Sequence, residues 1–328
     1  TTNLDLVKEG GTLTVTNCYK TTEAGTYGTL AFAYATATSN LGDLTHDYGM
    51  LKAYAGGILF DGTYYIDHGS GTEDDPYIIS NEYDWNTFAY DVNNGKNYSG
   101  KFVRLDADID ISTTVGLRGD KPFSGTFLGN RHTLTTNISS TTTGTGVNEQ
   151  GVAPFHYING ATIKDLTVAG TIASASYHTS GLVGFADGTN LIENCAVTAT
   201  LNIGSNYAGG IIGHGQGSTT TIRGCAFAGT INGVDGDRNN IGGIWGWSDS
   251  GTPALVNCLE AGTYTNIASM HPMGLQGGSG TITNCYYLNP QVGSPKNACT
   301  VSGAKQAYTF ATAPANLGSL VEDYGMVK

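Results

Sequence analysis

Apolar and polar positions recur along this chain with a spacing of about 30 residues. One phrase returns: a glycine, an aliphatic residue, a variable residue and a second glycine, then a polar turn, an aliphatic residue and, three positions later, a cysteine. Its copies begin at Gly151, Gly181, Gly210, Gly243 and Gly274. The cysteines that close it are Cys195, Cys225, Cys258 and Cys285, at steps of 30, 33 and 27 residues.

Such a repeat predicts a solenoid, because one unit of about 30 residues cannot bury its own apolar face and must stack on its neighbours. Within each unit, short β-rich runs are separated by Gly, Thr, Ser and Asn, without helical periodicity. We therefore expect an all-β fold, a right-handed parallel β-helix whose clearest coils span residues 151–288. The repeated glycines are expected at corners that need a positive φ or at points of close backbone approach.

One amphipathic helix is expected before these coils. Its apolar positions follow the helical spacing i, i+3, i+4 and i+7: Trp85, Phe88, Ala89 and Val92. Ser80 or Asn81 can cap its N-terminus, and Gly95 suits its C-terminal end. A short helix over about 81–94 would cover the raw strand edge that a β-helix exposes at its N-terminal end.

A second, longer period divides the chain. Residues 40–52 return as residues 316–328, 276 positions later, and the phrase around Cys18 matches the phrase around Cys285. We expect residues 1–66 to be the C-terminal tail of an upstream repeat unit or a cap segment, and residues 67–328 to form the β-helix domain. The chain would then be a segment of a long array, or a protein whose export signals have been removed.

Composition narrows the setting of the protein. Of 328 residues, 48 are glycine and 13% are charged, which is typical of an extracellular β protein. The formal net charge of −12, with 15 Lys and Arg, argues against nucleic acid or an anionic membrane as a partner, since both need a basic face. No apolar run reaches the roughly 18 residues of a membrane-spanning helix, so no membrane insertion is expected.

The repeated cysteines share a position that Leu166 fills in the first clear coil. A position that accepts Leu or Cys points inward, so a ladder of buried thiols is favoured, although stacking at roughly 4.8 Å leaves disulfides open. A metal site is not expected there, because ligands along a line do not form a tetrahedron.

Residues 67–290 also resemble a known family. The motifs run in the order GTEDDPYIIS, capping helix, YSGKFVRLDADIDIS, PFSGTFLGNRHTL and repeated SGLVGFADG…IENC. This order resembles the GLUG-motif proteins, surface and secreted bacterial proteins that also occur beside the protease part of IgA peptidases. The resemblance implies a parallel β-helix at a cell surface with an adhesive or unassigned role, and it carries no catalytic residue across. The His-Glu-x-x-His zinc motif expected of the peptidase part is absent from the sequence.

Strand alternation predicts an outward stripe on the coils, because the third and fifth residues of the phrase should face solvent and align. The candidate ligand-binding residues on this stripe are Phe155, Phe185, His214, Trp245 and Trp247. Aromatic faces suit the C–H surfaces of sugars, and an exposed apolar stripe usually marks a binding site. Alternatively, a loop, a corner of the coil or residues 1–66 cover it.

No cofactor is expected. One strand face carries Asp106, Asp108 and Asp110, and a polar loop spans Asp235–Asn239. Either group offers oxygen ligands for Ca²⁺. Neither has the spacing of an EF-hand, so solvated turns are the simpler interpretation.

The sequence favours a non-catalytic, extracellular module of a bacterial surface adhesin or surface-displayed repeat protein. It would bind host or microbial glycans or surface proteins through the stripe or through the loop Ser139–Gly146. A carbohydrate-active β-helix enzyme, a lyase or glycosidase, is one alternative, but the repeats supply no obvious pair of carboxylates and few cations. A purely structural stalk is the other, and a covered stripe would favour it.

Overall fold

The computed structural model describes residues 69–141, 150–274 and 280–295 in full, and the backbone of three short strands outside them. These are β1 (Cys18–Lys20), β2 (Ala31–Ala33) and β27 (Ala307–Thr309). Most of residues 1–66, most of the loop Ser139–Gly146 and the last repeat phrase from Leu275 onward to residue 279 lie outside the described residues.

The chain divides into two compact units, Thr1–Asp67 and His68–Lys328. In the first, β1 and β2 pair in parallel with Cys18 opposite Ala31. In the second, β26 (Cys285–Tyr287) pairs with β27 in the same way, with Cys285 opposite Ala307. The two cysteine-containing phrases that match in sequence therefore form the same type of strand pair.

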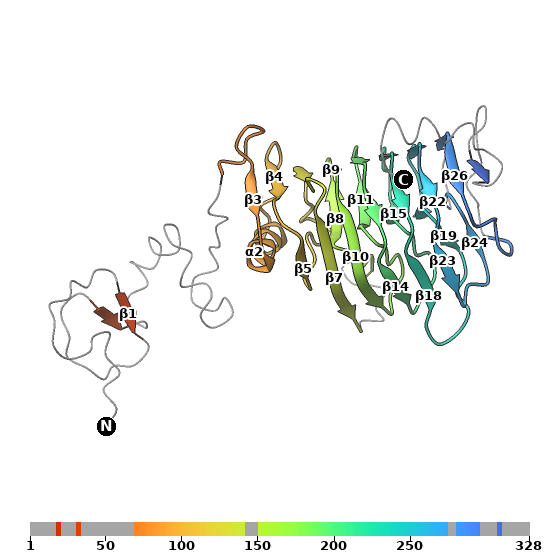
Figure 1. Cartoon of the computed structure of the whole chain (residues 1–328), viewed down its shortest axis with the longest axis horizontal. Helices are drawn as coiled ribbons and strands as arrows, with labels where there is room; N and C mark the ends of the chain where they lie inside the picture. Colours follow the sequence, from red (N-terminus) through yellow and green to blue (C-terminus); the bar gives the residue numbers. More distant parts are fainter. Residues whose placement is uncertain are drawn as a thin grey trace, which may run out of the picture. The chain divides into compact units, whose positions relative to one another are not determined.

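The second unit is a parallel β-helix, as the sequence predicts, with the strands of successive coils lying side by side (Figure 1). Its first face contains β3 (Tyr77–Ile79), β4 (Phe102–Leu105), β6 (Thr126–Leu128), β9 (Thr162–Lys164), β12 (Leu191–Glu193), β16 (Thr221–Arg223), β21 (Ala254–Val256) and β25 (Thr281–Thr283). Each of these strands pairs in parallel with the next.

The coils have two further faces. The second face contains β5 (Ile109–Ile111), β7 (Thr133–Ser140), β10 (Thr167–Ser174), β13 (Ala196–Val197), β14 (Thr200–Ile203), β17 (Ala226–Phe227), β18 (Thr230–Gly233), β22 (Leu259–Glu260), β23 (Thr263–Thr265), β26 and β27. The third face contains β8 (Phe155–Asn159), β11 (Val183–Asp187), β15 (Ile212–Gly215) and β20 (Trp245–Ser248). A short separate pair, β19 (Ile241–Gly242) with β24 (Met270–His271), lies between the second and third faces along the chain.

Register places equivalent residues of successive coils on top of one another and so builds the core. On the first face, one inward column of apolar side chains is at most 4% exposed: Val103, Phe127, Ile163, Ile192, Ile222, Leu255 and Ile282. Their outward neighbours on the same strands are polar or half-buried, as the alternation of a β-strand requires.

The corner after the first face has a left-handed backbone in every clear coil. Its residues have φ between 49° and 61°: Asp165, Asn194, Gly224, Asn257 and Asn284. Glycine, Asn and Asp tolerate this conformation best, which explains the residue that precedes each cysteine of the repeat.

The cysteine ladder is buried. The four described cysteines are fully buried free thiols that line up behind Leu166: Cys195, Cys225, Cys258 and Cys285. Successive thiols also accept from the backbone, as in the 3.4 Å contact between the Cys195 N–H and the Cys225 Sγ. The prediction of an inward apolar position is confirmed.

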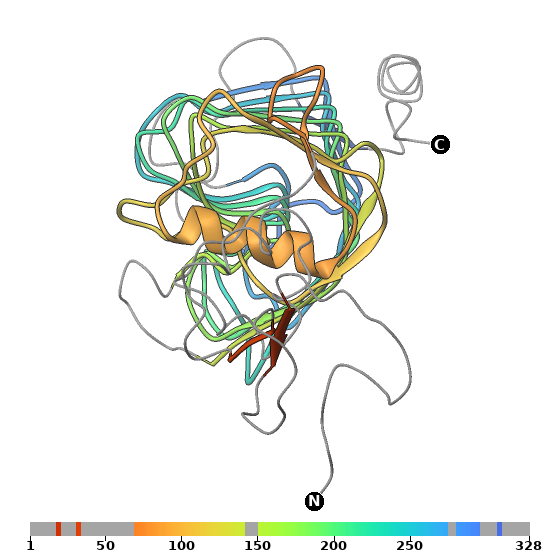
Figure 2. The same cartoon turned by 90° about the vertical axis from the view of Figure 1, so that its left-hand side faces the viewer.

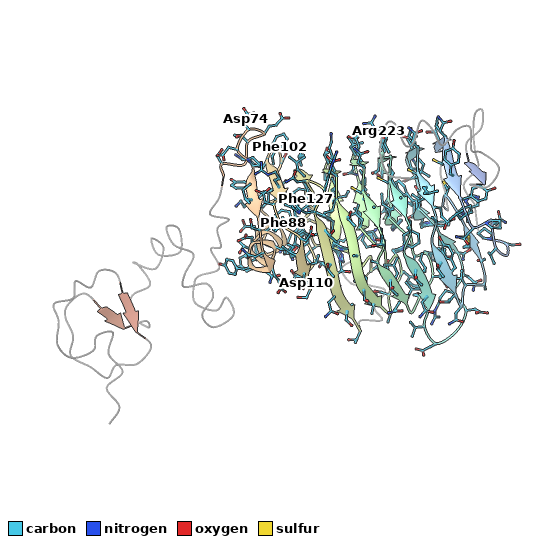
Figure 3. All side chains as sticks on the ribbon, in the orientation of Figure 1. Asp74, Phe88, Phe102, Asp110, Phe127 and Arg223 are labelled. Atoms are coloured by element: carbon cyan, nitrogen blue, oxygen red, sulfur yellow. The ribbon has the colours of Figure 1, made fainter. Side chains whose placement is uncertain are left out.

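The predicted capping helix is α2 (Glu82–Asn93), and it crosses the N-terminal end of the stacked coils (Figure 2). The Asn81 side chain caps it by accepting from the Asp84 N–H at 3.0 Å. Trp85 contacts Phe127 and Phe155 edge-on, with ring centroids 6.0 and 5.7 Å apart, so the helix closes the aromatic core of the first coils. Side chains such as Phe88 and Phe127 lie within these coils, whereas Arg223 lies at the outer surface (Figure 3). Among the described residues, no helix has the length and apolar character needed to span a membrane.

Substitutions at Asn257 test whether the left-handed backbone selects the residue at this corner. Asn257→Ala should lower the free energy of unfolding by about 1 kcal/mol, because alanine at φ 53° is strained, whereas Asn257→Gly should stay within about 0.5 kcal/mol of the wild type. Urea unfolding of the wild type and the two variants measures both changes in the free energy of unfolding. Equal losses for alanine and glycine would show that the left-handed backbone is not what selects Asn here.

Candidate functional site

The predicted outward stripe is wrong for four of its five residues. Phe155 and Phe185 are 0% exposed, Trp245 is 2% exposed and His214 is 5% exposed. On β11 and β15, consecutive residues are buried, which shows that both sides of the third face are covered rather than one. Phe155 instead belongs to the core, where its ring lies 5.1 Å from that of Phe127.

The register of the first coil also differs from the sequence alignment. Phe155 pairs with Val183, and Tyr157 pairs with Phe185, so the coil is shifted by two residues. The column that continues through Phe185, His214 and Trp247 therefore begins at Tyr157 and not at Phe155. Pairing across coils, which sequence spacing alone does not determine, sets this register.

The chain segment that returns from the second face to the third covers the third face and has its own regular stack. Parallel bridges join Ser180 to Gly209 and Gly209 to Gly242. Just before these bridges, a second left-handed column runs through the coils with φ between 59° and 75°: Gly151, His178, Tyr207 and Asn240.

The second glycine of the repeat phrase lets this column approach the third face. A Cβ on Gly213 would lie 1.9 Å from the His178 carbonyl oxygen, and one on Gly246 would lie 2.4 Å from that of Tyr207. These glycines do not have a positive φ themselves. Their role is close backbone approach, the second of the two explanations offered from the sequence.

Tyr207 is the unusual member of the left-handed column, because histidine, like asparagine, is enriched in this conformation. The left-handed conformation is a genuine outlier for a bulky side chain such as tyrosine, and such residues concentrate at functional sites. The same left-handed corner is occupied in the neighbouring coils by Gly151 and Asn240, residue types that adopt this conformation without strain. Tyr98 and Arg131 also have a positive φ outside this column, so the backbone of Tyr207 points to the surface around it together with the aromatic side chains that gather there.

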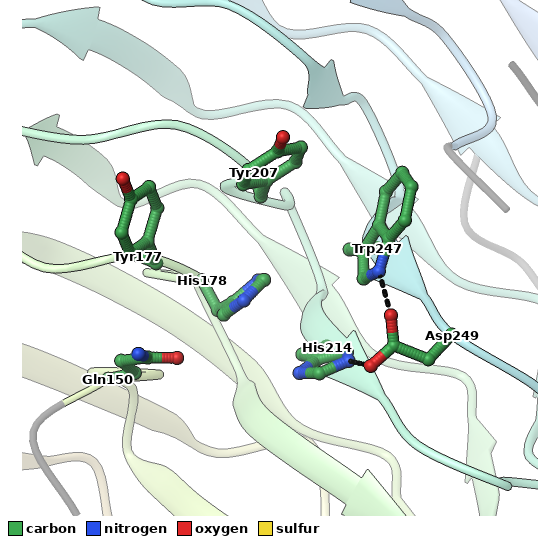
Figure 4. A pocket seen from close by; sticks show the side chains of 7 residues that line it. All are labelled: Gln150, Tyr177, His178, Tyr207, His214, Trp247 and Asp249. Atoms are coloured by element: carbon green, nitrogen blue, oxygen red, sulfur yellow. Dashed lines mark hydrogen bonds and ion pairs between the residues drawn. The ribbon is translucent and has the colours of Figure 1, made fainter. Parts of the chain in front are cut away.

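A pocket of about 260 Å³ lies there, between the return segments and the third face (Figure 4). Its lining residues come from four successive passes of the chain: Gln150, Tyr177, His178, Tyr207, His214, Trp247 and Asp249. His214 lies on β15 and Trp247 on β20, while the others lie on the return segments or directly after β20. The pocket thus includes His214 and Trp247 of the predicted stripe.

Aromatic rings form one continuous wall of the pocket. Tyr207 lies 5.9 Å from Tyr177 and 5.3 Å from Trp247 between ring centroids. Behind it, His178 stacks on His214 at 4.4 Å with an interplanar angle of 23°. These separations are ordinary contact distances between aromatic side chains, so the rings support each other's orientation.

Asp249 holds two of these rings by hydrogen bonds. Its Oδ2 accepts from Nε2 of His214 at 3.0 Å, and its Oδ1 accepts from Nε1 of Trp247. Because a carboxylate can only accept, Nε2 of His214 carries a proton, and its Nδ1 remains a buried acceptor that has no hydrogen-bond partner among the described residues. Nδ1 of His178 is likewise buried without a hydrogen-bond partner in that part of the chain.

The imidazoles around the pocket are held neutral. Burial lowers the pKa of His178 well below its usual value, and the neighbouring His214 and Arg118 lower it further. Burial also lowers the pKa of His214, against the opposing effect of Asp249. Arg118 lies just outside the lining, where its guanidinium carbon is 3.9 Å from the centroid of the Phe185 ring and its Nη2 donates to Gln216.

Sequence reasoning missed the lining residues Gln150, Tyr177, His178, Tyr207 and Asp249. The available signal was the alignment of the phrases YHTSG, NYAGG and NNIGG, residues 177–181, 206–210 and 239–243. An asparagine at Asn240 indicates a left-handed corner, and the equivalent positions in the other two phrases are aromatic.

Two of the three strand carboxylates have partners in the protein. Asp106 pairs with Arg104 at 2.6 Å, and Asp108 contacts His132 at 3.1 Å. Among the described residues, no group of three or more His, Cys, Asp or Glu is arranged to hold a metal ion.

No protein-family model matches the chain. A segment of halomucin from Haloquadratum walsbyi is 28% identical over 244 residues, which is 72% of this chain but 2% of halomucin. In structure, a Bacteroides ovatus protein provisionally described as an immunoglobulin A1 protease is similar with a TM-score of 0.48 and 19% identity, over 78% of this chain and 89% of that one. A TM-score this low carries no argument about function.

The buried imidazole of His156 predicts acid sensitivity. Burial, helped by Arg118, lowers its pKa to about 4, whereas an unfolded histidine titrates near 6.5. Below about pH 6.5 the unfolded chain therefore binds a proton that the folded chain does not, and stability falls by about 3 kcal/mol at most from this group as the pH drops towards 4.

His156→Leu should flatten the dependence of the unfolding free energy on pH between 6.5 and 4. Denaturant unfolding at a series of pH values measures it. Ile158→Val, a fully buried apolar change on the same strand, should lower stability equally at each pH. Parallel pH profiles for the wild type and His156→Leu would contradict the assignment.

Proposed function

We propose that this chain is a non-catalytic module of an extracellular, surface-displayed repeat protein, and that it binds glycans through the pocket around Tyr207. The observation that carries the proposal is the aromatic wall of Tyr177, Tyr207 and Trp247 next to polar groups in a concave site. Aromatic rings offer an apolar face to sugar C–H groups, while Gln150 and Asp249 offer hydrogen-bonding groups for hydroxyls.

Strain at the pocket supports binding over a purely structural role. Tyr207 occupies a left-handed corner at a cost of about 1 kcal/mol, and two buried ring nitrogens, Nδ1 of His178 and of His214, have no hydrogen-bond partner among the described residues. A stalk would be more stable with Asn or Gly at this corner, as at Asn240 and Gly151. Local rules are broken in this way mainly at functional sites.

The proposed setting rests on composition, fold and similarity. A Gly-rich chain with 13% charged residues, a rigid β-helix and similarity to a short segment of the far longer halomucin all suit a repeated module of a large surface protein. The motif order that resembles GLUG-motif proteins supports the same setting. An adhesive role, towards host or microbial glycans, follows from the setting together with the pocket.

A glycosidase is the weaker candidate for this pocket. Hydrolysis by the usual route needs two carboxyl groups flanking the scissile bond. Among the described residues that line the pocket, Asp249 is the single carboxylate, so the second carboxyl group is missing there. The same argument makes passive binding the better account of the site.

Tyr207→Asn separates binding from stability. Asparagine suits φ 63°, so relief of about 1 kcal/mol of strain offsets the lost ring contacts of about 1 kcal/mol, and the free energy of unfolding should stay within about 1 kcal/mol of the wild type. Glycan binding should fall at least tenfold because the wall loses its central ring. Binding to a broad glycan array and urea unfolding provide the two measurements.

Tyr90→Ala, a half-buried aromatic on α2 away from the pocket, is the control and should bind like the wild type. A well-folded wild-type protein that binds no glycan would refute the proposal. Retained binding by Tyr207→Asn would move the site elsewhere.

A further inference from the structure

The charges and ring geometry of the pocket define the class of sugar that it takes. We infer that the pocket binds a single neutral sugar residue in contact with the rings of Tyr207 and Trp247, and discriminates against acidic sugars and against ammonium ligands. This inference rests on the proposed glycan-binding function and adds its specificity. Size, charge and the spacing of the rings each support one part of it.

The volume limits the occupant to a small unit. Pockets that enclose drug-sized ligands usually measure roughly 300–1,000 Å³, and this one measures about 260 Å³. One sugar residue, at a chain end or as a side branch, suits that space better than several consecutive residues of a polysaccharide.

The charge of the lining disfavours acidic sugars. Asp249 is the one described lining residue that carries a formal charge at neutral pH, because burial keeps His178 and His214 uncharged. Arg118 acts electrostatically on Asp249, but its guanidinium donates to Gln216 and lies on the Phe185 ring, outside the lining. A uronate or sialate carboxylate would therefore meet the like charge of Asp249 in the pocket with no lining cation to pair with directly.

Ring spacing disfavours an ammonium ligand, although three aromatic residues and a carboxylate resemble the composition of an aromatic cage. A cage surrounds its cation with ring faces and so needs gaps between the rings. Here Tyr207 lies 5.9 Å from Tyr177 and 5.3 Å from Trp247 between centroids, with interplanar angles of 42° and 59°, so the rings form a row in contact and do not face one another across a gap. Each ring offers its own face, and the flat apolar side of a pyranose ring matches one such face.

Direct titration of the full chain tests the inference. The probes are methyl glycosides of neutral hexoses and N-acetylhexosamines, the free uronates and sialic acid, and choline as the ammonium probe, each followed by isothermal titration calorimetry and by ligand-observed NMR. We expect at least one neutral glycoside to bind at least tenfold more tightly than every acidic sugar and than choline. Trp247→Ala should abolish that binding, and Tyr90→Ala should not affect it.

Asp249→Asn supplies the second, charge-specific variant. It removes the negative charge while keeping the shape, so the ratio of uronate to neutral-sugar affinity should rise by about tenfold. The ratio is an internal control, since any loosening of His214 and Trp247 affects both sugars. An unchanged ratio would overturn the part of the inference that rests on charge.

The remaining outcomes are distinguishable. Preference for an acidic sugar in the wild type would overturn the inference while leaving glycan binding intact. Binding of choline in preference to every sugar would identify a cation site and overturn both the inference and the glycan proposal. Binding of array glycans that is unaffected by Trp247→Ala would place the glycan site outside this pocket and would refute the inference.

Discussion

Parallel hydrogen bonding between coils is the constraint on which the rest of this molecule depends. Because each strand lies in register on the strand before it, one repeat position has the same backbone conformation and the same surroundings in every coil. The inward column of the first face satisfies this demand with apolar side chains, and the corner at Asn194 and Asn257 satisfies it with residues that tolerate a left-handed backbone. The sequence repeats because the physical demands repeat.

The pocket lies where two coils carry a different residue type at a repeated position while keeping the same backbone conformation. His178 and Tyr207 occupy a column that ends in Gly151 and Asn240, and the hydrogen-bonded bridges on either side hold all four residues in one conformation. Strain of about 1 kcal/mol at Tyr207 is tolerable against the roughly 5–15 kcal/mol that typically stabilises a folded domain. A rigid stack can therefore present bulky side chains at corners where an isolated turn would reject them.

The fold could be predicted from the sequence because its signals are local and repeated: the 30-residue period, the helical spacing of Trp85 and Phe88, and one apolar slot shared by Leu166 and the cysteines. The site could not. Alternation along β11 and β15 shows which side chains share a side, but not that a return segment covers the other side. The return segment has no apolar period. It can lie close to the third face because Gly213 has no Cβ, and nothing in the sequence distinguishes Gly213 from the other glycines. The two-residue shift of the first coil arises from pairing between coils, which the repeat spacing alone left undetermined.

The position of the pocket also changes how multivalent binding would have to arise. A stripe of equivalent aromatic residues would offer many weak contacts along one solenoid, with neighbouring contacts one coil apart. The structure instead gathers Tyr177, Tyr207 and Trp247, from three successive coils, into one concave site. Each coil contributes one aromatic side chain, and the three side chains meet only when the coils stack in register. Gains in avidity would then depend on several copies of the unit, and on the spacing and stiffness of whatever joins them, rather than on several coils of one unit.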